Sequence, residues 1–225
     1  MRTIIIAIDG PAGSGKSTTA RLVAARLGYT YIDTGAMYRA ITLAMLEHGA
    51  PISGDMLAEF VAGLNVELRY AESGQRTYLN GRDVSERIRH ADVTSDVSRV
   101  SAIPVVRTAM VALQQQLARQ GGVVMDGRDI GTVVFPDAEL KIFMTASIEA
   151  RAQRRMAELG SEQNSFSVED IAMQLALRDE MDSSRDTSPL TKADDAIVID
   201  TSGVTIEEQV ERITALARER IAIPA

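Results

Sequence analysis

The apolar positions of the first fifty residues follow two different patterns in turn. Residues 4–8 form a short apolar run without a period, which is typical of a strand buried on both faces of a parallel sheet. Residues 17–28 carry apolar side chains at helical spacing and end in glycine, and residues 29–33 predict a second strand. A helix follows, which we expect Thr34 to cap and Gly49 to end. This alternation predicts a parallel sheet with crossover helices.

The middle of the chain has a different pattern. Two alternating runs, at 65–70 and 75–81, are separated by a polar turn and predict an antiparallel hairpin with one exposed face. We expect the segment from 60 to about 89 to be a small β-rich insertion on the main sheet. Helical spacing then predicts two helices, at 90–102 and at 104–122, and the second begins with a proline.

The pattern of the first fifty residues returns in the last hundred. Short apolar runs predict three further buried strands, at 122–126, 140–144 and 196–200. Helical spacing predicts three helices, the first two dense in charge, at 147–160, 167–185 and 205–222. We therefore expect one α/β domain in which a parallel sheet is flanked by helices.

Composition and charge narrow the class of protein. The 225 residues, 45% of them hydrophobic, suffice for one well-buried core with small lobes. The formal net charge of −7 argues against a general binder of nucleic acid or membrane surfaces. The absence of cysteine excludes disulfides, thiolate metal sites and cysteine nucleophiles. Neither a signal peptide nor an apolar run of about 20 residues is recognisable, so we expect a cytoplasmic protein. We expect a monomer, because no long apolar stripe is left unmatched.

The stretch GPAGSGKST, residues 10–18, is a phosphate-binding loop candidate. It fits the pattern G-x-x-x-x-G-K-[ST], and a buried strand precedes it while a helix follows it. Glycines let backbone N–H groups turn inward around an anion, and the helix start adds the positive end of its dipole. Lys16 would place a charge on the β- and γ-phosphates, and the Ser17 hydroxyl would bind Mg²⁺. The predicted ATP-binding residues of the loop are Gly10, Pro11, Ala12, Gly13, Ser14, Gly15, Lys16, Ser17 and Thr18.

Several classes of protein share such a loop. Residues 191–194, TKAD, resemble the guanine-reading tetrapeptide of GTPases, but they follow a polar stretch with a proline and not a buried strand, which favours an ordinary turn. A motor ATPase would need a larger core. A nucleotide-binding switch that hydrolyses ATP slowly stays an alternative. The short chain favours a small kinase.

A kinase for a phosphorylated acceptor needs a second anion site, which we expect at the carboxyl ends of the core strands. Candidate arginines occur at four places, which are Arg39, the Arg128–Asp129 pair of the sequence DGRD, the group Arg151, Arg154 and Arg155, and the group Arg178, Asp182 and Arg185. The last group has i, i+4, i+7 spacing, which predicts one helical face. Each place also has a plain structural explanation, such as a solvated helix face, a local row of ion pairs, or an arginine stem covering apolar surface. Asp126, at the end of a strand, could lie near Mg²⁺.

The chain resembles the bacterial cytidylate kinases along nearly its whole length. The resemblance is carried by GPAGSGKST, DTGAMYR, DGRDIGTVVFPDA, KIFM and ARAQRRM, in that order, and the DGRD stretch is the most specific. It implies a P-loop kinase fold with a five-stranded parallel sheet, a core at about 1–34, 104–145 and 190–225, a nucleoside-monophosphate-binding lobe at about 35–103 that includes the β-rich insertion, and a helical lid at about 146–189. It also implies transfer of phosphate from ATP to CMP or dCMP with Mg²⁺.

The resemblance further implies which residues act on the phosphates. Arg151 and Arg155 would belong to the lid and approach ATP, and Arg128 would bind the acceptor phosphate, around which two more arginines complete a cage. The implied catalytic residues are Lys16, Arg128, Arg155, Arg178 and Arg185.

The remaining implied residues recognise the acceptor nucleoside. Thr34 and Arg39 would contact its phosphate and sugar, and Asp182 would bind the ribose hydroxyls; many relatives carry serine in place of Thr34. The cytosine edge would be read by Ser98, Arg107 and Asp129. Acceptors for the cytosine N4 amine and a donor to N3 or O2 would be left unpaired by uracil, so such a site can discriminate against UMP. A kinase for UMP or another small acceptor stays the nearest alternative.

Overall fold

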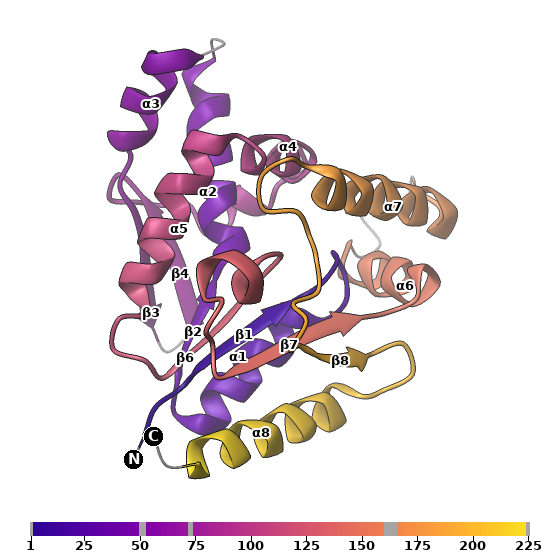
Figure 1. The fold of residues 1–225 in the computed structure, drawn as a ribbon. Helices are drawn as coiled ribbons and strands as arrows, with labels where there is room; N and C mark the ends of the chain where they lie inside the picture. The colour runs from indigo at the N-terminus through magenta and orange to yellow at the C-terminus, as the bar shows by residue number, and fades with distance from the viewer. Residues whose placement is uncertain (1, 50–52, 72–73, 160–165, 224–225) are drawn as a thin grey trace. The chain divides into compact units, whose positions relative to one another are not determined.

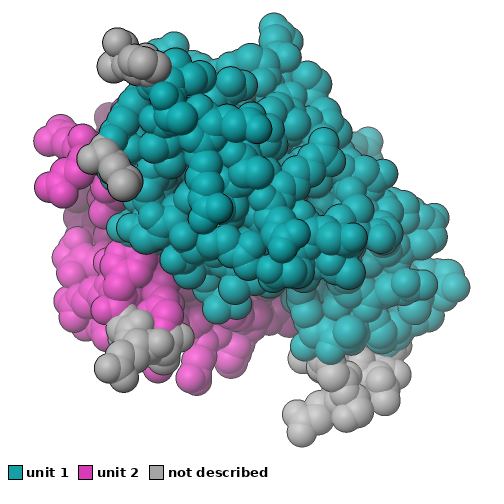
Figure 2. Space-filling view, turned by 90° about the horizontal axis from the view of Figure 1, so that it is seen from below, with its two compact units in different colours: residues 1–31, 121–225 teal, residues 32–120 magenta. Residues whose placement is uncertain are grey.

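The computed structural model describes residues 2–49, 53–71, 74–159 and 166–223 (Figure 1). The chain forms two compact units, one of residues 1–31 and 121–225 and the other of residues 32–120, which Figure 2 colours separately. No helix in the described part of the chain combines the length and the apolar character needed to cross a membrane.

The first unit is built on a parallel sheet. Within the described residues the sheet has five strands in the order β2-β6-β1-β7-β8, which confirms the predicted α/β architecture. The strands are β1 (Ile5–Asp9), β2 (Thr30–Asp33), β6 (Val123–Gly127), β7 (Leu140–Thr145) and β8 (Ile197–Asp200). Strand β1 pairs in parallel with both β6 and β7, so its carboxyl end lies at the centre of the sheet edge where ligands bind in such folds.

Four helices described in the first unit belong to two apolar clusters. Helices α1 (Lys16–Leu27) and α8 (Ile206–Ala222) lie side by side (Figure 1) and share one cluster with the strands β1, β6, β7 and β8. Helices α6 (Ile148–Leu159) and α7 (Val168–Ser184) pack against each other and form a second cluster, which includes Ala12 of the phosphate loop. The helix pair after β7 is therefore anchored on the loop that would hold the nucleotide.

The second unit combines helices with a small antiparallel sheet. Its elements are α2 (Thr34–His48), α3 (Gly54–Ala62), β3 (Val66–Ala71), β4 (Gly74–Leu79), β5 (Arg82–Asp83), η1 (Arg87–Arg89), α4 (Ala91–Ser101) and α5 (Pro104–Leu117). The predicted hairpin is confirmed, because β3 pairs antiparallel with β4 and β4 with β5. The proline that begins α5 occupies a first-turn position, where its missing N–H has no partner to lose.

Three local predictions are wrong. Asp33, and not Thr34, caps α2, because its side chain accepts the Ala36 N–H at 2.9 Å. Helix α3 precedes the hairpin, so the first residues of the expected β-rich insertion are helical. Helix α7 ends at Ser184, and Arg185 has extended backbone angles, so Arg185 does not continue the helical face of Arg178 and Asp182.

Candidate active site

The phosphate loop connects the central strand β1 to α1. Gly10 has φ of 147°, and a Cβ placed there would lie 2.0 Å from the carbonyl oxygen of Met144 on the neighbouring strand. Only glycine fits this approach of two backbones. Gly15, with φ of 88°, occupies the position before α1 in a left-handed conformation. Ser17 and Thr18 are exposed on the first turn of α1, where a bound phosphate would meet the helix N-terminus.

Lys16 lies inside the loop. Its ammonium group donates to the carbonyl oxygen of Pro11 at 2.6 Å and to the Ser14 hydroxyl at 3.4 Å. Burial, together with the nearby positive charge of Arg128, lowers the pKa of Lys16 to about 7. A phosphate in the loop would supply the negative charge that favours the protonated form of this lysine.

A hydroxyl and a carboxylate meet beside the loop. Ser17 Oγ donates to Asp126 Oδ2 at 2.8 Å, and the Tyr31 hydroxyl donates to Asp126 Oδ1 at 2.8 Å. Such oxygen atoms are the ligands that Mg²⁺ prefers. Among the residues that the structure describes, no group of three or more His, Cys, Asp and Glu side chains could hold a metal ion. The pair fits a Mg²⁺ ion that takes its other ligands from phosphate and water.

A cluster of charges follows strand β6 in the same unit. Arg128 Nε donates to Asp182 Oδ2 at 2.8 Å, and Asp182 is almost fully buried. Burial by itself would raise the pKa of Asp182, but the charges of Arg128, Arg178 and Arg185 outweigh it and hold this pKa below its ordinary value. Arg185 Nη2 also lies 3.9 Å from Asp129 Oδ1. The structure thus brings together the five predicted residues of the first unit that surround the acceptor in the resemblance.

The two predicted lid arginines have different surroundings. Arg151 is buried, and its Nη1 donates to the carbonyl oxygen of Ala12 at 3.1 Å and to Asp179 Oδ2 at 2.5 Å. It therefore ties α6 and α7 to the backbone of the phosphate loop. Arg155 forms an exposed ion pair with Glu158 at 3.0 Å, one turn further along α6. The geometry of Arg155 is that of a solvated helix face.

The predicted acceptor residues of the second unit are grouped near the start of α2 and on α4 and α5. Thr34 is buried in the first turn of α2, and Arg39 Nη1 donates to Thr94 Oγ1 at 2.6 Å. Arg107 is 2% exposed, donates to the carbonyl oxygen of Ser101 at 3.2 Å, and has its guanidinium carbon 5.3 Å from the centre of the Tyr38 ring. Ser98 is buried on α4. Burying a guanidinium costs free energy unless its N–H groups have hydrogen-bonding or negatively charged partners.

Sequence reasoning missed several residues that shape the site. Asp179 is the ion-pair partner of Arg151. Thr201 accepts from the candidate Arg154 and donates to the Ser14 carbonyl oxygen. Asp9 accepts two backbone N–H groups of the turn after Asp129. The signal in the sequence was an acidic residue at the end of an otherwise apolar strand, but its partners are more than a hundred positions away.

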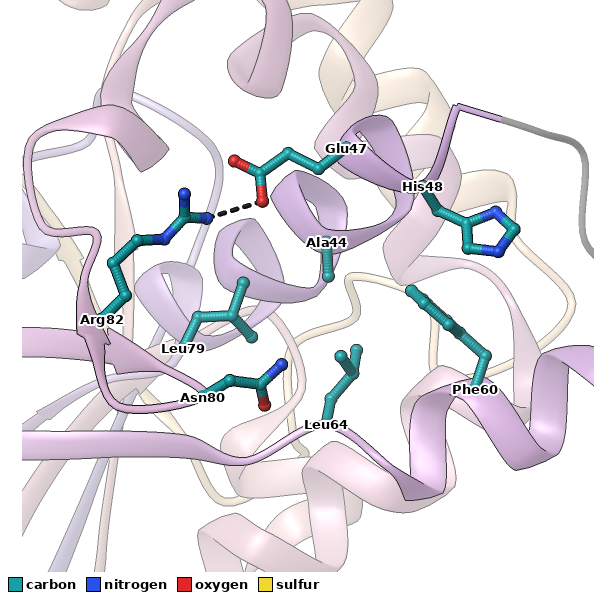
Figure 3. A pocket seen from close by; sticks show the side chains of 8 residues that line it. All are labelled: Ala44, Glu47, His48, Phe60, Leu64, Leu79, Asn80 and Arg82. Atoms are coloured by element: carbon teal, nitrogen blue, oxygen red, sulfur yellow. Dashed lines mark hydrogen bonds and ion pairs between the residues drawn. The ribbon is translucent and has the colours of Figure 1, made fainter.

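A cavity of about 390 Å³ lies elsewhere, inside the second unit (Figure 3). The rings of His48 and Phe60 meet edge to face at its rim, and Glu47 pairs with Arg82 at 2.6 Å across it. It is lined by Ala44, Glu47, His48, Phe60, Leu64, Leu79, Asn80 and Arg82, none of which is a candidate site residue.

The fold and the site together define a P-loop kinase. The defining features are the strand order, the loop between β1 and α1, and the arginine cluster around Asp182. A crystal structure of an uncharacterised protein of Eubacterium ventriosum is similar in fold, with a TM-score of 0.54 at 14% identity, covering 97% of this chain and 99% of that one.

Sequence comparison is more specific. The family model for cytidylate kinase matches residues 6–219. A cytidylate kinase of Bacillus cereus is 52% identical over 216 residues, which cover 96% of each chain, and one of Exiguobacterium sibiricum is 50% identical over 218 residues, which cover 96% of this chain and 98% of that one. The chain belongs to the cytidylate kinase family.

Proposed function

We propose that the protein transfers the γ-phosphate of ATP to CMP or dCMP, giving ADP and CDP or dCDP. Such a reaction serves pyrimidine nucleotide metabolism. The observation that carries the proposal is the charge cluster of Arg128, Arg178 and Arg185 around Asp182, in the same compact unit as the phosphate loop. Membership of the cytidylate kinase family supports CMP as the acceptor.

The phosphate loop and the arginine cluster would each hold one of the two phosphate groups that react. Phosphoryl transfer depends mainly on alignment of the donor and acceptor and on neutralisation of charge. The backbone N–H groups of the loop and Lys16 would hold the donor phosphates. Arg128, whose charge is near enough to lower the pKa of Lys16, would hold the acceptor phosphate beside them. The same closeness that makes Arg128 and Lys16 repel each other in the absence of ligand would favour the binding of two phosphates.

We infer that the reaction uses Mg²⁺, held by Ser17 and Asp126. The ion would supply positive charge between the β- and γ-phosphates. Support comes from the 2.8 Å contact between the Ser17 hydroxyl and the Asp126 carboxylate at the carboxyl end of β6. Tyr31 would keep the carboxylate oriented through its hydrogen bond to the other oxygen atom.

Recognition of the base and the movement of lobes stay predictions. Asp129 would accept from the cytosine amine, and Ser98 and Arg107 would complete the reading of the base. The helices α6 and α7 fall within the proposed lid at 146–189, and their cluster with Ala12 would let the lid respond to occupancy of the phosphate loop. The segment 35–103 would act as the lobe that binds the monophosphate.

The experiment is a coupled assay of ADP release with MgATP and, separately, CMP, dCMP, UMP and AMP. We expect CMP and dCMP to raise the rate of ADP release far above that of a reaction without acceptor. Equal stimulation by UMP would indicate a kinase with a broader acceptor range. A rate with CMP equal to that without acceptor would contradict the proposal and favour a nucleotide-binding switch.

A further inference from the structure

A short turn begins directly after the acceptor candidates Arg128 and Asp129. It is a π-helical turn, η2 (Ile130–Val134), and its first two N–H groups point to one carboxylate. Asp9 Oδ1 accepts the Ile130 N–H at 2.8 Å, and Asp9 Oδ2 accepts the Gly131 N–H at 2.7 Å. Asp9 is the last residue of β1 and directly precedes the phosphate loop. One side chain therefore joins the donor loop to the acceptor turn.

The bonds made by Asp9 are those that a local capping residue normally makes. The first N–H groups of a helical turn lack partners within the turn, and an aspartate at the preceding position usually accepts one of them. The residue at that position is Asp129, yet its side chain makes no capping hydrogen bond. Its Oδ1 instead lies 3.9 Å from Arg185 Nη2. Because Asp9 caps the turn from another strand, the carboxylate of Asp129 faces the charge cluster.

The turn also packs closely against Lys141 of the neighbouring strand β7. A Cβ added to Gly131 would lie 3.2 Å from Cδ of Lys141 on β7 and 3.4 Å from Oδ2 of Asp9. The backbone of the turn is thus confined between two strands of the sheet. A carboxylate at this place fixes the position of the turn as well as the partners of its N–H groups.

Capping the turn with Asp9 requires a negatively charged carboxylate to be buried, which costs free energy. Asp9 is 5% exposed, and burial raises its pKa to about 6, against the effect of its two backbone hydrogen bonds. The negative charge of Asp129 raises this pKa further, and the positive charge of Lys16 lowers it. If Asp129 capped the turn itself, the buried carboxylate of Asp9 would not be needed. The side chain of Asp129 would then point away from Arg185.

We propose that Asp9 is a positioning residue, which caps η2 so that the carboxylate of Asp129 is directed to the acceptor base. Loss of the Asp9 carboxylate would leave two N–H groups that Asp129 can reach, and Asp129 would then cap its own turn. The inference rests on the proposed function, because it concerns how the acceptor is recognised.

The test is a double-mutant cycle on the full chain with Asp9→Asn and Asp129→Ala. Asparagine matches aspartate in size and keeps one oxygen acceptor, so we expect Asp9→Asn to fold with one N–H group of η2 left for Asp129. The variant should raise the KM for CMP about tenfold and lower the preference for CMP over UMP by a similar factor, with the KM for ATP changed less than about twofold. In the Asp129→Ala background, Asp9→Asn should add less than about a twofold change, since both act through one group.

Thr19→Val is the matched control, because it removes a buried hydrogen bond to Gln209 in the same unit that involves no residue of η2. It should lower the melting temperature and leave the preference for CMP over UMP unchanged. Additive effects of Asp9→Asn and Asp129→Ala, or an equal loss of kcat with every acceptor, would overturn the role of Asp9 and leave the proposed function standing. A wild type that gives no CMP-dependent ADP release would overturn both. If Asp9→Asn and Asp9→Ala both fail to fold, Asp9 is a residue of the fold alone, and the inference is wrong.

Discussion

The sharpest prediction from the charge cluster concerns Asp182. Its carboxylate is 3% exposed, and it is the shared counter-charge of Arg128, Arg178 and Arg185. Removing one partner of a buried ion pair costs about 3–5 kcal/mol, because the other partner stays buried without compensation. Asparagine keeps an oxygen acceptor for Arg128, so we expect Asp182→Asn to lower the free energy of unfolding by about 3 kcal/mol. For a chain of this size that corresponds to about 6–12 °C in melting temperature.

Calorimetry at pH 7 without nucleotide measures this change. Asp186→Asn is the control, because Asp186 is an exposed carboxylate shortly after the same helix and should change the melting temperature by less than about 2 °C. Added inorganic phosphate should raise the melting temperature of Asp182→Asn more than that of the wild type, since an anion replaces the missing charge. Equal melting temperatures for the two variants would refute the view that Asp182 holds the cluster together.

Three further predictions follow from single residues. Lys16→Ala should lower kcat by about 100-fold or more while thermal unfolding stays cooperative, because the charge stabilises transferring phosphate and not the fold; an unfolded variant would contradict this. Asp129→Ala should reduce the preference for CMP over UMP about tenfold, with the KM for ATP nearly constant; an unchanged preference would remove Asp129 from base recognition. The folded-state pKa of Asp9, about 6, lies above its ordinary 3.8, so its contribution to stability is fully present below pH 4 and is lost as the pH rises through 6. The free energy of unfolding of the wild type relative to Asp9→Asn should therefore fall by about 2 kcal/mol between pH 4 and 7 in denaturant titrations, and a constant difference would show that Asp9 does not titrate in this window.

The features that could be predicted from sequence are those set by neighbouring residues. The phosphate loop is a continuous stretch, and its glycines are fixed by backbone geometry that a pattern can state, as the 2.0 Å approach at Gly10 illustrates. The buried strands were recognisable because a parallel strand covered on both faces is apolar throughout. Gly28 and Gly49 end their helices in left-handed conformations, as expected of glycine at those positions.

The features that could not be predicted depend on contacts between distant residues. Asp33 and Thr34 are both good capping residues, and only the path of the backbone decides that Asp33 accepts the Ala36 N–H. Helix α3 is only nine residues long and begins at a glycine, so its buried pair Leu57 and Val61 was too short a signal.

The partners of charged side chains were the hardest to foresee. Spacing placed Arg185 on the face of α7, but the helix ends one residue earlier, and Arg185 reaches the cluster from extended backbone. The bonds from Asp9 to the turn after Asp129 join positions 121 and 122 residues apart. Such pairings follow from the order of strands in the sheet, which a single sequence leaves open.

The most direct test of the central claim is the stoichiometry of the reaction. The purified protein is mixed with MgATP and CMP, and ADP and CDP are quantified together by chromatography over the course of the reaction. Phosphoryl transfer to CMP predicts one CDP for each ADP at every time point, and formation of CDP slowed about 100-fold or more when Lys16→Ala replaces the wild type. Accumulation of ADP and inorganic phosphate without CDP would contradict the account, because it would show that the phosphate loop serves hydrolysis.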